Sequence, residues 1–114
     1  MISTTSIQSG VKLLAKSMEQ SADELNTADG QLGDGDLGVT MIQGFRNIME
    51  ILDSLPEDIG MAIYECAKAL TKSSGSSFGT IMATGMMAVA KVKKEQTGIE
   101  LEEVSELFLS LIHI

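Results

Sequence analysis

Apolar residues recur every three or four positions along most of this chain. Near the N-terminus the steps between them are 4, 3, 4, 4 and 3, over the residues Ile7, Val11, Leu14, Met18, Ala22 and Leu25. Because an α-helix has 3.6 residues per turn, this spacing places the apolar side chains on one helical face. The repeat predicts a chain of amphipathic helices.

Composition agrees with an all-α fold. The 114 residues include eight Met, one Pro, no Trp and only 4% aromatic residues, so the residue types preferred in strands are scarce. With 44% hydrophobic residues, a chain of this length has enough apolar material for one small core. We therefore predict an all-α protein with a single domain over residues 1–114.

Two stretches rich in Gly, Asp and Ser interrupt the repeat, at 29–35 and 72–77. Pro56 marks a further boundary, because its ring disfavours a helical conformation in the residue before it. Together these signals predict helices at about 5–25, 38–55, 56–71, 78–94 and 101–111. In the second helix the apolar stripe consists of Val39, Ile42, Phe45, Met49 and Leu52.

The sequence ends in the middle of an apolar stripe, with no cap and no polar tail. We interpret it as a fragment truncated at the C-terminus, with a tail after about residue 108 that need not be native. His113 lies in that tail and is not expected to act as a general base or metal ligand. Cys66, the single cysteine, is expected to be a small buried core residue.

The charge balance limits the partners. Eight Lys and Arg against sixteen Asp and Glu give a net charge of −8, which argues against binding to nucleic acid. A nucleotide can still bind if a metal ion supplies the positive charge locally. No stretch approaches the ~20 apolar residues of a membrane span, and the N-terminus has no signal peptide pattern. We expect a cytoplasmic protein that does not associate with membranes.

Three carboxylates, those of Asp29, Asp34 and Asp36, fall within the first interruption and are separated by glycines. Glycines let the backbone turn tightly enough to direct several side chains at one point. Carboxylates that converge repel one another, and hard oxygen ligands of this kind suit Mg²⁺ or Ca²⁺ better than zinc. The alternative is a solvated acidic turn, since Asp and Gly are common in turns. Spacing alone does not decide between them.

Two better-known motifs do not fit this segment. Residues 33–38 match the dinucleotide pattern G-x-G-x-x-G, but a predicted helix precedes them where that motif requires a strand. A calcium EF-hand counted from Asp34 has Val39 where Gly is needed and Phe45 where Glu is needed. A Walker lysine motif is also missing from the sequence. Phosphates would then be held by metal, backbone amides and helix starts.

Two predicted helix starts could hold an anion. One begins at Gly38, directly after the carboxylates, and the other follows the serine-rich stretch at 73–79. A helix N-terminus presents free N–H groups, and serine hydroxyls add further donors. For the serine stretch, an ordinary helix cap is the alternative.

Taken together, the two interruptions resemble the nucleotide-binding L subunit, or L domain, of dihydroxyacetone kinases. The first hallmark of that family is an aspartate, four residues, then G-D-x-D-x-G leading into a helix, and here residues 29–38 match it. The second is a turn of the form S-G-x-x-[FY]-G-T, which is similar to residues 74–80. The order and separation of the two matches are compatible with the family.

This resemblance implies roles for particular residues. Asp29, Asp34 and Asp36 match the family's aspartates that hold Mg²⁺ against the phosphates of ATP or ADP. The residues that match the nucleotide pocket are Leu37, Gly38, Val39, Thr40, Ser73, Ser74 and Gly75. No residue matches a catalytic nucleophile. The family usually has His where this chain has Leu37, and commonly Asn where it has Thr40.

The resemblance also implies a larger assembly. The family's fold is an eight-helix antiparallel up-and-down barrel, of which this chain would form about the first five helices. Dihydroxyacetone would be held by a partner K subunit or domain, and some members keep ADP that a phosphotransferase protein recharges. A homo-oligomer is also expected. The alternative from a different class is a non-catalytic helical module that binds a metal or a partner through its acidic loop.

Overall fold

The computed structural model describes residues 1–72, 77–103, 106 and 109. Its α-helices are α1 (Thr4–Gly30), α2 (Leu37–Ile51), α3 (Ile59–Thr71) and α4 (Ser77–Lys93). Short 3₁₀ turns follow α2 and β2, as η1 (Leu52–Ser54) and η2 (Leu101–Glu103). Two strands of two residues each, β1 (Ile2–Ser3) and β2 (Gly98–Ile99), pair in antiparallel register. The all-α prediction is confirmed.

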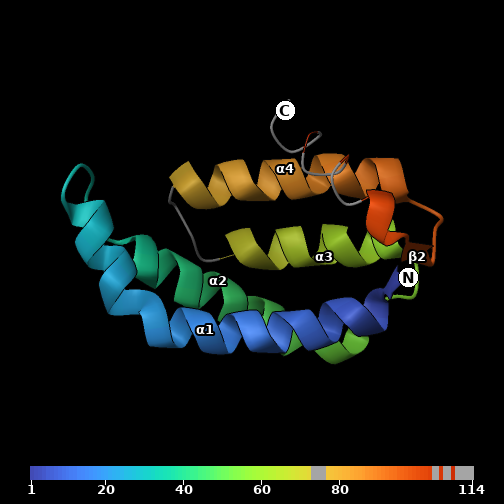
Figure 1. The fold of residues 1–114 in the computed structure, drawn as a ribbon, viewed down its shortest axis with the longest axis horizontal. Helices are drawn as coiled ribbons and strands as arrows, with labels where there is room; N and C mark the ends of the chain where they lie inside the picture. Colours follow the sequence, from blue (N-terminus) through green and yellow to red (C-terminus); the bar gives the residue numbers. More distant parts are fainter. Residues whose placement is uncertain (73–76, 104–105, 107–108, 110–114) are drawn as a thin grey trace.

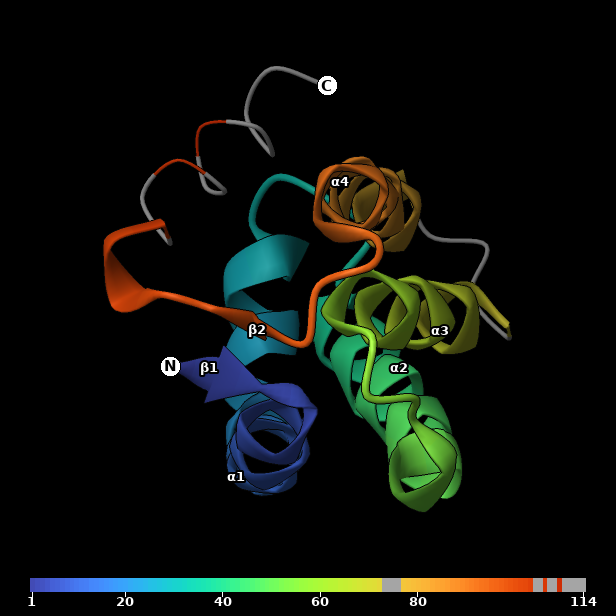
Figure 2. The same cartoon turned by 90° about the vertical axis from the view of Figure 1, so that its right-hand side faces the viewer.

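Consecutive helices run antiparallel and pack side by side (Figure 1). Seen nearly end-on, α3 lies between α2 and α4, and α1 packs on α2 (Figure 2). This up-and-down order brings the end of α1, the start of α2, the end of α3 and the start of α4 to one end of the molecule (Figure 1). The β1–β2 pair lies at the opposite end. Among the described residues, no helix combines the length and apolar character that crossing a membrane requires.

The core forms mainly between α2 and α3, with single residues from α1 and α4. Its buried members are Val11, Met41, Phe45, Ile48, Leu52, Cys66, Ala67, Ala69, Leu70 and Ala83. Burial raises the pKa of the Cys66 thiol to about 11, with a smaller contribution from the negative charge of Glu65. Cys66 is therefore a neutral core residue, as its position in the apolar stripe predicts.

Helix α1 is longer than its apolar stripe. The stripe ends at Leu25, but the helix continues to Gly30, so Asp29 lies in its last turn and not in a loop. The prediction of a loop from residue 29 is wrong because backbone hydrogen bonds, not apolar contacts, sustain the final turn. Glycine, which is the weakest helix former after proline, then ends it.

The boundary between α2 and α3 also differs from the prediction. Helix α2 ends at Ile51, with a 3₁₀ turn behind it, and Leu55 is extended with ψ of 136°. Pro56 lies outside both helices, and α3 begins only at Ile59, with Asp58 as its N-cap. Proline imposes the extended conformation on the residue before it, and Asp is a strong N-cap. The helix therefore starts after Asp58 and not at Pro56, where it was predicted.

Some stripe residues are exposed. Leu14 on α1, and Val39 and Met49 on α2, are each at least 40% exposed in the structure. The buried stripe consists of Met41, Phe45 and Ile48 on α2 and continues to Leu52 in η1, which is rotated from the predicted stripe. Periodicity identifies a helix, but the neighbouring helix decides which part of its surface is covered. The predicted helix at 101–111 falls mostly outside the described residues, as does His113.

Candidate metal centre

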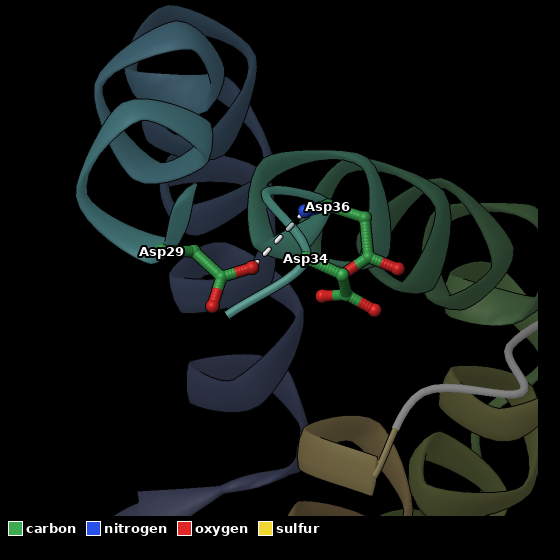
Figure 3. A group of neighbouring side chains, drawn as sticks. All are labelled: Asp29, Asp34 and Asp36. Carbon is green, nitrogen blue, oxygen red and sulfur yellow. Dashed lines mark hydrogen bonds between the residues drawn. The ribbon is translucent and has the colours of Figure 1, made fainter. Parts of the chain in front are cut away.

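Three short segments bring the predicted carboxylates together. Asp29 projects from the last turn of α1, Asp34 lies in the turn between the helices, and Asp36 is the N-cap of α2 (Figure 3). One carboxylate oxygen from each residue lies within 4.8 Å of the others. Asp34 and Asp36 are exposed and Asp29 is partly buried, so the cluster opens to solvent.

The turn is tight because two of its positions are glycine. The Gly33 amide donates to the Asp29 carbonyl at 2.6 Å, which folds the chain back over the end of α1. A Cβ at Gly33 would lie 2.5 Å from Asp29 Oδ1, so only glycine fits there without a shift. Gly35 has φ of +77°, a left-handed conformation that other residues adopt only with strain. Both glycines help to direct the carboxylates to one point.

The start of α2 is bound by side chains of α1. Asp29 Oδ2 accepts hydrogen bonds from the amides of Asp36 and Leu37, at 3.0 and 3.2 Å (Figure 3 shows the first). The Gly38 amide donates to Asn26 Oδ1 at 2.7 Å. The sequence predicted that the amides at this helix start would be free for an anion, but those of Leu37 and Gly38 already have partners. These amides of the first turn thus bind side chains of α1 and are not free for an anion.

Electrostatics within the cluster are unfavourable without a cation. The pKa of the Asp36 carboxyl is raised, first by a hydrogen bond with Asp34, then by some loss of hydration, and then by the charges of Asp34 and Asp29. Such a rise means that the ionised form is disfavoured where three negative groups converge. A bound divalent cation would remove this penalty.

The donor set fits Mg²⁺. All three ligands are hard carboxylate oxygens, and two oxygens on one Mg²⁺ lie at most about 4.2 Å apart, because each bond is about 2.1 Å long. Neighbouring oxygens of an octahedral Mg²⁺ lie about 3.0 Å apart, so the three oxygens, which lie within 4.8 Å of one another, would have to move closer together to bind one ion. The open side of the cluster leaves room for the waters or phosphates that complete the coordination of Mg²⁺.

The other predicted site residues have different positions. Gly38 and Thr40 are buried, Leu37 packs against the core, and Val39 is 61% exposed at the surface of α2. Ser73, Ser74 and Gly75 lie outside the described residues. The start of α4, which directly follows them, is at the same end of the molecule as the carboxylates (Figure 1).

Sequence reasoning missed Asn26. Its side chain holds the first turn of α2, and it lies three residues before Asp29, on the same face of α1. The only signal in the sequence was that spacing. It carried no weight while the helix was expected to end at Leu25.

The chain is similar to proteins of one known family. The model of the DAK2 domain family matches residues 31–113, a range that includes Asp34 and Asp36. The chain is 27% identical, over 88 residues, to the "PEP-dependent dihydroxyacetone kinase, ADP-binding subunit DhaL" of Escherichia coli. It is 29% identical, over 89 residues, to "Dihydroxyacetone kinase 1" of Saccharomyces cerevisiae. These alignments cover 76% and 71% of this chain, but 42% and 15% of the two relatives, so the chain spans less than half of either.

Proposed function

The chain belongs to the DAK2 domain family, and on that premise we propose that it is the magnesium- and nucleotide-binding half of a dihydroxyacetone kinase. In this proposal the chain supports transfer of the terminal phosphoryl group of ATP to dihydroxyacetone, which leaves ADP; the ADP is either exchanged for ATP or recharged in place by a phosphotransferase protein. The sugar is held by a partner K subunit or domain. The names of the two relatives support this assignment at the level of the family.

One observation carries the proposal: three carboxylate oxygens within 4.8 Å, at the end of the molecule where α2 and α4 begin. A protein with a net charge of −8 would repel a nucleotide at such a cluster. A divalent cation held there reverses the local charge, so that the same carboxylates attract phosphates. The geometry therefore supports a metal–nucleotide complex better than either component alone.

Each residue has a limited task in this mechanism. Asp29, Asp34 and Asp36 hold Mg²⁺, which when bound neutralises charge on the phosphate oxygens. Asp29 also fixes the first turn of α2 through two amides, so its carboxylate is already oriented before a cation binds. Val39 and the start of α4 are proposed to line the nucleotide, together with the turn at Ser73, Ser74 and Gly75. No residue of this chain is proposed as a nucleophile.

Leu37 separates this chain from the usual family pattern. Where the family has His, Leu37 instead packs its side chain against the core. A polar contact from that position is therefore replaced by an apolar one. From the family pattern we also propose a homo-oligomer that uses either ATP turnover or bound ADP recharged by a phosphotransferase protein.

Isothermal calorimetry with Mg-ADP and Mg-ATP tests the proposal. We expect nucleotide binding that requires Mg²⁺ and is lost in the double variant Asp34→Asn with Asp36→Asn. The matched control is Asp23→Asn with Asp53→Asn, which changes the charge equally at two exposed positions outside the cluster. Equal binding by both double variants would show the kinase assignment to be wrong. Metal binding without any nucleotide binding would instead favour the non-catalytic acidic module.

A further inference from the structure

Two aspartates occupy the same position at the start of a helix but behave differently. Asp58, the N-cap of α3, accepts a hydrogen bond from the Met61 amide at 2.8 Å. Asp36, the N-cap of α2, makes no such capping bond with its side chain. An N-cap aspartate ordinarily accepts from the second or third amide of its helix, because those N–H groups have no partner within the helix. Asp36 departs from this rule, and its backbone differs as well: ψ is 9° at Asp36 but 117°, the usual extended conformation of an N-cap, at Asp58.

The reason lies on α1. The second residue of α2 is Gly38, and its amide already donates to Asn26 Oδ1 at 2.7 Å. Asp29, three residues further along α1, accepts from the amides of Asp36 and Leu37. Two side chains of α1 therefore cap α2 in place of its own N-cap residue.

Gly38 makes this arrangement possible. It is buried, and a Cβ there would lie 2.7 Å from Asn26 Oδ1 and collide with the carbonyl oxygen of Ala22. Without that Cβ, the backbone of α2 approaches α1 closely enough for a side chain as short as asparagine to reach the amide. The contact is thus built into the junction of the two helices.

We propose that Asn26 is a positioning residue of the metal centre: by binding the Gly38 amide it holds the first turn of α2 against α1, and with it the Asp36 backbone in a conformation that keeps the carboxylate near Asp29 and Asp34. Without Asn26, the start of α2 is free to take the ordinary N-cap conformation, in which Asp36 would accept from the Val39 amide as Asp58 accepts from Met61, and one ligand would leave the cluster. This inference rests on the proposed function, because it assigns a role within the same site. It adds a residue that carries no charge and binds no ion itself.

The first experiment needs no metal. Asn26→Leu keeps the size of the side chain and improves helix propensity but removes the acceptor. If Asp36 then becomes the cap, Asp36→Ala will lower the urea midpoint in the Asn26→Leu background. In the wild-type background, where Asp36 caps nothing, the same change will not lower the midpoint. Equal effects in both backgrounds would overturn the inference.

The second experiment measures Mn²⁺ binding from the electron paramagnetic resonance signal of the free ion. We expect Asn26→Leu to weaken binding about tenfold, the scale set by one hydrogen bond. Asn26→Asp, which keeps an acceptor oxygen, should bind within a few-fold of wild type. The control is Gln8→Leu, which removes the bond from Gln8 Nε2 to the Leu52 carbonyl at the far end of α1 and should leave Mn²⁺ affinity unchanged.

The outcomes separate this inference from the proposed function. If wild type binds Mn²⁺ and Asn26→Leu binds it equally well, Asn26 has no positioning role and the metal centre still stands. If Gln8→Leu weakens binding as much as Asn26→Leu, the effect is one of general stability and the inference falls. If wild type binds no Mn²⁺, both the metal centre and the inference are wrong. Should Asn26→Leu fail to fold, Asn26→Ala replaces it in both experiments.

Discussion

Gly33 controls the position of the Asp29 carboxylate. A Cβ at this residue would lie 2.5 Å from Asp29 Oδ1 and 3.0 Å from its carbonyl oxygen. The neighbour that would have to move is the same carboxylate that holds the amides of Asp36 and Leu37. One added methyl group would therefore disturb both the proposed metal ligand and the start of α2.

We expect Gly33→Ala to weaken Mn²⁺ binding, because the Asp29 side chain must rotate away from Asp34 and Asp36. The measurement is Mn²⁺ affinity, with urea unfolding alongside it. Gly10→Ala is the control, because a Cβ at Gly10 would point into open space, and alanine in a helix adds up to ~1 kcal/mol of stability. Wild-type affinity in Gly33→Ala would show that Asp29 is not a ligand.

Among the site residues, the sequence predicted those whose side chains have a distinctive chemistry. Three aspartates separated by glycines imply convergent carboxylates, and the structure brings them together. Asn26 could not be predicted, because a neutral amide on a helix has many possible uses. Its role depends on the closeness of α2 to α1, and that follows from the buried position of Gly38.

The helix boundaries are the part of the fold that the sequence predicted wrongly. Pro56 predicted a break, which exists, but α3 begins at Ile59 because Asp58 provides its cap. Apolar periodicity detects the middle of a helix, where side chains pack. It is insensitive to the ends, where single hydrogen bonds decide between helix and turn.

We expect Asp58→Ala to lower the free energy of unfolding by about 1 kcal/mol, since the Met61 amide loses its acceptor. Asp58→Asn should have a much smaller effect, because asparagine is an equally good N-cap. Urea unfolding of both variants provides the measurement. A similar loss in both would indicate that the charge of Asp58, and not its capping bond, stabilises α3.

The whole molecule places the starts of α2 and α4 at one end (Figure 1). Because the helices run antiparallel, α2 and α4 both begin at this end, although Ser77 comes 40 positions after Leu37 in the sequence. Periodicity predicted the helices but not this order, which came from the family resemblance. It also did not predict the faces that pack, because exposed Val39 and buried Met41 are equally apolar in the sequence.

Two further glycines, Gly60 and Gly44, allow neighbouring helices to approach closely. The atoms that a Cβ would meet are of different kinds at the two positions. A Cβ at Gly60 would lie 2.5 to 2.6 Å from backbone atoms of Ala90 and Lys94, at the end of α4. A Cβ at Gly44 would lie 2.5 Å from Leu70 Cδ1, the far end of a flexible side chain. Backbone atoms in a packed helix move only with the helix, whereas a leucine can rotate.

Gly60→Ala should therefore destabilise the protein by about 1–3 kcal/mol, because α3 must separate from α4. In Gly44→Ala the gain of up to ~1 kcal/mol in helix propensity offsets the smaller cost of moving Leu70, so the net change should be close to zero. Urea unfolding of the two variants compares them directly, with unchanged m-values as the check that the unfolding transition is the same. If both variants lose equal stability, α3 and α4 are not held at backbone contact. The rigid pairing of these helices, which fixes where α4 begins relative to the carboxylates, would then have to come from other contacts.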